Sequence, residues 1–109
     1  MKRGYLATLG LLLVLGCPGT KKIKELLDDP AKYDGQNVRV AGEVKEAAGV
    51  LGFGGYTIDD GTGSLTVVTQ GGGTPRVGAR IGVEGTFRAA FTIGTRTGAV
   101  LMEKQRRGQ

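Results

Sequence analysis

Side chains that could act as nucleophiles or general bases are scarce in this chain of 109 residues. It has no histidine, Ser64 is its only serine and Cys17 its only cysteine. Nucleophilic catalysis usually requires a hydroxyl or thiol next to a base, and no such arrangement is recognisable. We therefore expect no enzymatic activity, no catalytic residues and no cofactor.

Cys17 lies where a different chemistry has a use for it. The chain starts with Lys2 and Arg3, continues with an apolar run from Tyr5 to Leu15, and reaches Cys17 through Gly16. A positive start, a short apolar run and small residues are typical of a secretory signal peptide. The apolar run is shorter than the roughly 20 residues that a membrane-spanning helix needs.

The residues Val-Leu-Gly-Cys at 14–17 resemble the lipobox of bacterial lipoproteins. The resemblance implies cleavage before Cys17 and attachment of a diacylglyceryl group to its sulfur. Two or more acyl chains, at about 0.8 kcal/mol per buried CH₂, would then hold the protein at the membrane lipid. It would face the periplasm or the extracytoplasmic side, and Pro18 in place of an aspartate favours the outer membrane. The alternative is an ordinary signal peptide with a chance cysteine.

Asp59 and Asp60 are adjacent carboxylates, which could ligate Ca²⁺ or Mg²⁺. They precede Gly61-Thr62-Gly63, and aspartate followed by glycine is typical of a tight turn between two strands. We favour the turn and expect no metal site.

Aromatic and arginine side chains are the remaining candidates for a binding surface, because a single-strand binder needs exposed rings flanked by cations. Tyr56 has the parity of Ile58 in its strand, which predicts a core position for this ring. The candidate ligand-binding residues are Phe53, Tyr56, Arg76, Arg88, Phe91 and Arg96. The net charge of +5 does not mark a polyanion surface, because residues 36–104 hold seven basic and six acidic side chains.

Hydrophobic patterning predicts one short helix followed by strands. Residues 21–33 have Ile23, Leu26 and Leu27 on one helical face, with Thr20 as the N-cap and Pro30 ending or kinking the helix. Alternation then predicts strands at 38–44 and 81–87, and the segments 55–59, 64–69 and 99–104 are also strand-like.

Two connections between these strands bear on function. Residues 46–52 and 88–96 are predicted to be loops, the first apolar and the second mixing apolar residues with arginines. Gly42 and Gly85 fall on the inward parity of their strands, which suits a bulge, a bend or the close approach of a neighbouring strand.

Five short strands without room for crossover helices predict a mainly β fold, a five-stranded antiparallel barrel with a short N-terminal helix. The expected organisation is a signal peptide at 1–16, a lipidated tether at 17–20, helix and turn at 21–35, the barrel at 36–104 and a basic tail at 105–109.

The order of the segments Val38-x-Val40-x-Gly42-x-Val44, Tyr56-x-Ile58-x-Asp60 and Ile81-x-Val83-x-Gly85 resembles that of an OB-fold, a Greek-key barrel. The chain is similar to small periplasmic OB-fold proteins. The resemblance implies that the first strand pairs with both the second and the fourth. It also implies a ligand site near the loops at 46–52 and 88–96.

We therefore expect a membrane-anchored envelope lipoprotein that is a non-catalytic binding module for a protein or a small ligand. Phe53, Arg88, Phe91 and Arg96 are the expected contacts, because the adjoining loops are apolar and the folded body is nearly neutral. The alternative is a single-stranded oligonucleotide on the face of the second and third strands. A third possibility is a structural protein packed against a larger envelope assembly.

Overall fold

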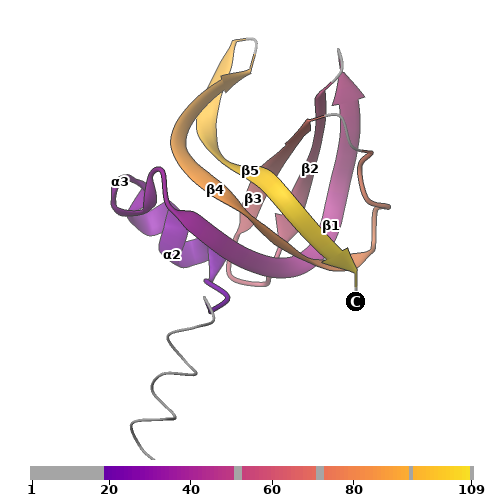
Figure 1. Ribbon diagram of the computed structural model, residues 1–109, viewed down its shortest axis with the longest axis horizontal. Coiled ribbons are helices and arrows are strands. Elements are labelled where there is room, and N and C mark those ends of the chain that lie inside the picture. Colours follow the sequence, from indigo (N-terminus) through magenta and orange to yellow (C-terminus); the bar gives the residue numbers. More distant parts are fainter. Residues whose placement is uncertain (1–18, 51–52, 71–72, 94, 109) are drawn as a thin grey trace, which may run out of the picture.

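In a computed structural model, residues 19–50, 53–70, 73–93 and 95–108 are described and form five strands and two short helices (Figure 1). The segment predicted to be a signal peptide, residues 1–16, and the predicted lipidation site Cys17 lie outside these residues. No helix in the described part is long and apolar enough to cross a membrane. The elements are α2 (Ile23–Asp28), α3 (Pro30–Tyr33), β1 (Asn37–Val50), β2 (Phe53–Asp59), β3 (Ser64–Gln70), β4 (Arg80–Ile93) and β5 (Arg96–Gly108).

The five strands close into a ring in the order β1-β2-β3-β5-β4. β1 pairs first with β4, over Asn37–Glu43, and then with β2, over Glu43–Val50, as the resemblance implied. The predicted all-antiparallel arrangement is wrong at one seam. Thr66–Val68 of β3 runs parallel to Val100–Met102 of β5, because closing the ring brings together two strands that run in the same direction. The sheet is therefore mixed.

Two segments predicted to be loops are strands. Residues 46–50 extend β1 and pair with β2, and residues 88–93 extend β4 and pair with β5. The backbone ladder continues along each hairpin even where alanine and glycine give no apolar alternation. The predicted tail is also largely strand, since residues 105–108 of β5 pair with Ile81–Glu84. We call residues 88–93 and 96–99 the β4–β5 arm.

The core lies inside the ring and is built by alternation along each strand. Helix α2 contributes Ile23 and Leu26 to it, both fully buried. Burying each large aliphatic or aromatic side chain stabilises the fold by about 1.5–3 kcal/mol. The largest fully buried strand residues are Val40, Val44, Ile58, Leu65, Val67, Val83, Phe87 and Leu101.

Gly42 and Gly85 mark where strands of the ring approach most closely. A Cβ atom on Gly42 would overlap the carbonyl oxygen of Asp59, and one on Gly85 would overlap that of Met102. Both glycines are needed for close backbone approach, which confirms one of the functions predicted for these two inward positions.

Helix α2 is capped from a distant part of the chain. Its N-cap residue is Lys22, not the predicted Thr20, and no local side chain caps it. Instead the Ile23 N–H donates to Oδ2 of Asp60 at 2.9 Å. Thr20 forms a parallel bridge with Arg39 of β1, and the adjacent Lys21 N–H donates to the Arg39 carbonyl at 2.7 Å. Pro30 separates α2 from α3 as predicted.

Candidate functional site

The outer face of β2 and β3 is where an oligonucleotide, the alternative ligand, would bind. Tyr56, Ile58, Leu65 and Val67 point into the ring, so the alternate residues face outward. Opposite Thr57 on the neighbouring strand β1 is the exposed Glu46. Among the described outward residues of β2 and β3 there is the carboxylate of Asp59 but no lysine or arginine, and the nearby cation is Lys45 of β1, which lies 3.5 Å from the Glu43 carboxylate. The outward residues of β2 and β3 that are not buried are Gly55, Thr57, Asp59, Ser64 and Thr66, whereas Val68, on the same parity, is buried.

Tyr56, a candidate stacking platform, lies in the core with 2% of its surface exposed. Its hydroxyl donates to Oε1 of Glu103 at 2.5 Å, and burial together with this hydrogen bond raises the pKa of the phenol. Arg106 lies over the ring at 5.7 Å, with Nη1 3.4 Å from the Glu103 carboxylate. Nη2 of Arg106 donates to the Gly73 carbonyl at 3.1 Å. The core position predicted for Tyr56 is confirmed, and its ring is covered.

The two partners of Tyr56 were missed in the sequence. Glu103 is 47 residues from Tyr56, and Arg106 had been assigned to a tail. A carboxylate at 103 followed by an arginine at 106 does not by itself predict a contact with Tyr56. It becomes meaningful only when the ring brings β5 next to Tyr56.

Arg76 lies in the connection between β3 and β4 and is exposed. This connection lies alongside β1. The Val44 N–H donates to the Ala79 carbonyl at 2.9 Å, and the Gly78 N–H donates to the Val44 carbonyl at 2.8 Å. It lies on the other side of the molecule from the β4–β5 arm (Figure 1). Arg76 therefore does not join the other candidates.

The β4–β5 arm brings together three of the candidate residues. Arg88 and Arg96 are exposed and Phe91 is half-buried. Arg88 pairs with Val100, and Phe91 pairs with Gly98 after a register shift between Arg88 and Phe91. Phe91 does not belong to the core cluster, whereas Phe87 in the same strand is fully buried in it.

Phe53, the fourth expected contact, begins β2 opposite Val50 and Gln70. Its side chain lies outside the described part of the structure. The end of the β1–β2 hairpin and the β4–β5 arm extend from the same side of the ring, away from α2 and α3 (Figure 1).

The arm has a simple charge pattern. Between Thr86 and Met102, the only charged side chains are Arg88 and Arg96. In the described part of the chain, neither arginine forms an ion pair with a carboxylate. The arm is therefore positive, whereas the described outward residues of β2 and β3 carry a carboxylate and no cation.

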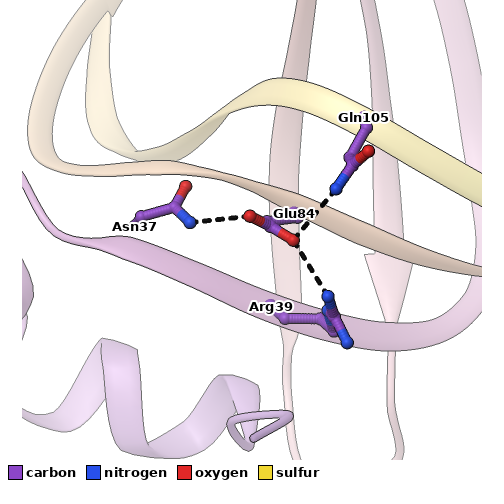
Figure 2. Close-up of polar contacts among 4 residues, drawn as sticks. All are labelled: Asn37, Arg39, Glu84 and Gln105. Atoms are coloured by element: carbon purple, nitrogen blue, oxygen red, sulfur yellow. Dashed lines mark hydrogen bonds and ion pairs between the residues drawn. The ribbon is translucent and has the colours of Figure 1, made fainter. Parts of the chain in front are cut away.

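Glu84 lies on the outer wall of β1, β4 and β5, where three side chains converge on its carboxylate (Figure 2). Asn37 Nδ2 donates to Oε2 at 2.8 Å, and Arg39 Nη2 and Gln105 Nε2 donate to Oε1 at 3.0 and 3.1 Å. These hydrogen bonds lower the pKa of Glu84 to about 2. A hollow of about 250 Å³ beside the cluster is lined in part by Gly82 and Arg107. Both carboxylate oxygens of Glu84 accept hydrogen bonds, so this residue of β4 links β1 and β5. We call this set of hydrogen bonds the clamp at Glu84.

Asp59 and Asp60 bind their own turn. Asp59 accepts from Gly61 N–H at 2.7 Å and from Ser64 Oγ at 3.0 Å, and these bonds lower its pKa. Partial burial raises the pKa of Asp60, but hydrogen bonds from Thr62 and from backbone N–H groups outweigh it and lower the pKa. Among the residues that the structure describes, no group of three His, Cys, Asp or Glu side chains could hold a metal ion.

Comparison with known proteins identifies the fold but no family. No protein-family model and no curated protein sequence matches the chain. Among solved structures, an OBody bound to hen egg-white lysozyme is 16% identical with a TM-score of 0.64, covering 84% of this chain and 96% of that one.

Aminoacyl-tRNA synthetases are also similar in structure. Asparaginyl-tRNA synthetase from Pyrococcus horikoshii, complexed with asparaginyl-adenylate, is 22% identical with a TM-score of 0.68 over 83% of this chain. A putative aspartyl-tRNA synthetase from Leishmania major is 14% identical with a TM-score of 0.64 over 83% of this chain. This chain spans only 22% and 21% of those two synthetase chains. At these identities the likeness shows the OB-like fold alone.

Proposed function

We propose that this protein is a non-catalytic binding module, held at the envelope membrane through lipidated Cys17, that recognises a protein or a small ligand with its β4–β5 arm. The observation that carries the proposal is the collection of Arg88, Phe91 and Arg96 on one hairpin extending from a closed ring. Half-buried aromatics and arginines are enriched where proteins bind other proteins.

The charge distribution favours a protein or small ligand over an oligonucleotide. A single strand needs a positive groove and stacking rings, but the described outward residues of β2 and β3 include Asp59 and no cation, and Lys45 of the adjacent β1 is paired with Glu43. Tyr56, an aromatic residue of β2, is buried, and its hydroxyl donates a hydrogen bond to Glu103. The OBody, which has a similar fold, is bound to a protein, lysozyme. This supports the capacity of such a fold for protein binding.

The anchoring part of the proposal is supported by the residues before the fold. The described fold begins two residues after Cys17, so an acylated cysteine would hold the ring close to the bilayer surface. Mass spectrometry of the protein extracted from membranes tests this. A diacylglyceryl adduct on an N-terminal Cys17 is expected, whereas a mature chain with an unmodified thiol would contradict it.

The binding surface is tested by charge reversal in the full chain. The Arg88→Glu/Arg96→Glu variant and an Arg76→Glu control are expressed in producing cells, cross-linked in membranes and extracted with detergent. Partners cross-linked to the wild-type protein and the Arg76→Glu control should be absent with the arm variant. Equal cross-linking by all three proteins would show that the arm is not the binding surface.

The same preparations separate the oligonucleotide alternative. Single-stranded DNA should bind with worse than micromolar affinity at 150 mM salt. Micromolar or tighter binding that weakens steeply with added salt would favour the oligonucleotide instead.

A further inference from the structure

One edge of the β4–β5 arm has no strand beside it. β5 pairs with β3 only over Val100–Met102, so the β3 side of residues 96–99 has no strand partner in the described structure. Residues 95–98 are all exposed. Unpaired backbone N–H and C=O groups along a strand edge are a template for an added strand.

The other edge of the arm is partly occupied. On the outer side of β4, Phe87 N–H donates to the Gln36 carbonyl at 2.9 Å and the Phe87 carbonyl accepts from Gly35 N–H at 2.7 Å. Two residues on, Ala89 N–H donates to Oδ1 of Asp34 at 2.8 Å. The β4 edge is therefore already occupied at Phe87 by backbone hydrogen bonds and at Ala89 by the Asp34 carboxylate. This carboxylate would repel an acidic segment. Among the residues that the structure describes, the β5 edge at 96–99 has neither a paired strand nor a bonded carboxylate.

The charge of the arm restricts what can pair along this edge. Arg88 and Arg96 are its only charged side chains, and no carboxylate partner is present for either in the described structure. A second copy of the chain would bring two positive arms together, which is unfavourable. An acidic segment would place opposite charges side by side.

From the free edge and the unpaired arginines, we infer that the partner of the β4–β5 arm is an extended acidic segment of another polypeptide, added as a strand beside residues 96–99 of β5. This inference rests on the proposed use of the arm as the binding surface and adds the chemistry and geometry of the partner. Four paired residues span about 13 Å of strand. Main-chain hydrogen bonds would give affinity, and Arg88 and Arg96 would select for acidic side chains.

The test uses the full chain purified in detergent and a capped seven-residue peptide of alternating glutamate and valine. Two N-methylated isomers of this peptide are compared, each lacking the backbone N–H donors along one of its two edges. A peptide with lysine in place of each glutamate reverses the charge. Hydrogen exchange measures protection of the amides at 96–99, and fluorescence titration measures affinity.

The inference predicts a specific combination of results. The acidic peptide should protect amides within 96–99, and one N-methylated isomer should bind about tenfold or more weakly than the other. Arg88→Gln/Arg96→Gln should weaken binding about fivefold to tenfold, whereas Arg76→Gln should leave it unchanged. The lysine peptide should not bind measurably.

Other outcomes overturn the inference and separate it from the proposed function. Protection elsewhere, equal binding by both N-methylated isomers, or equal competition by oligo(dT) would each exclude recognition by an added acidic strand. Failure of the peptide to bind, while charge reversal of the arm still abolishes cross-linking in membranes, would overturn this inference and leave the proposed function standing. If charge reversal also leaves cross-linking unchanged, both fail.

Discussion

Phe87 and Phe91 lie four residues apart in β4, in two regions that differ in how their side chains are packed. Phe87 belongs to the ring, is fully buried and pairs with Leu101. Phe91 belongs to the β4–β5 arm, is half-buried, and pairs with Gly98 beyond a register shift. Inside the ring each inward side chain is fixed by neighbours from several strands. In the arm each residue has one strand beside it, so the arm can carry residues chosen for recognition.

The largest difference should be seen by truncating these two rings. Phe87→Ala should lower the free energy of unfolding by about 3–5 kcal/mol, because it leaves a cavity at the centre of the core. Phe91→Ala should cost less than about 1 kcal/mol, since this ring lies outside the core cluster. Urea unfolding followed by circular dichroism measures both. Equal losses would mean that the arm is packed as tightly as the ring.

A smaller effect is expected where the turn between β2 and β3 caps α2. Asp60→Ala removes the acceptor of the Ile23 N–H and the bonds within the turn, and should destabilise the protein by about 1–2 kcal/mol. For a domain of this size, this lowers the melting temperature by roughly 4–16 °C. Arg96→Ala in the arm should change it little. If Asp60→Ala lowered the melting temperature no more than Arg96→Ala does, Asp60 would not stabilise the start of α2.

The smallest effect concerns the clamp at Glu84 and appears only in acid. The folded pKa of about 2 lies below the ordinary value of 4.5, so the ionised carboxylate stabilises the fold above pH 4.5. That contribution is lost as the pH falls from about 4.5 to about 2. Wild type should therefore lose more stability than Glu84→Gln across this window, measured by unfolding at successive pH values. Parallel curves for the two proteins would show that Glu84 is not held as described.

The ring was largely predictable because its residues repeat one simple rule. Strand-like segments predicted parts of all five strands, two of them by apolar alternation, and the inward parity of Gly42 and Gly85 pointed to the close backbone approach that the structure shows. Tyr56 was expected in the core from its parity with Ile58, and it lies there. These predictions depend on short-range pattern, which the sequence displays directly.

The missed features depend on long-range pairing. The arm was predicted to be a loop because Ala89, Ala90 and Gly94 interrupt the alternation, and the sequence does not show that β5 continues the ladder. The Tyr56–Glu103 and Asn37–Glu84 bonds each join residues 47 positions apart. The parallel pairing of β3 with β5 follows only from closure of the ring. For the proposed site, the candidate residues Arg88, Phe91 and Arg96 came from the sequence, whereas the backbone edge without a strand partner in the described structure did not.

The distant cap of α2 has a consequence for the order in which the chain acquires its structure. A helix of six residues is far too short to persist alone, and the group that holds its first N–H lies 37 residues further along the chain. At about 5–20 residues per second, synthesis needs roughly 2–8 s to supply that acceptor after Ile23 has been made. Helix α2, the first element of the described residues, therefore lacks this cap until the β2–β3 turn has been made. We expect α2 to become stable only together with, or after, the turn between β2 and β3.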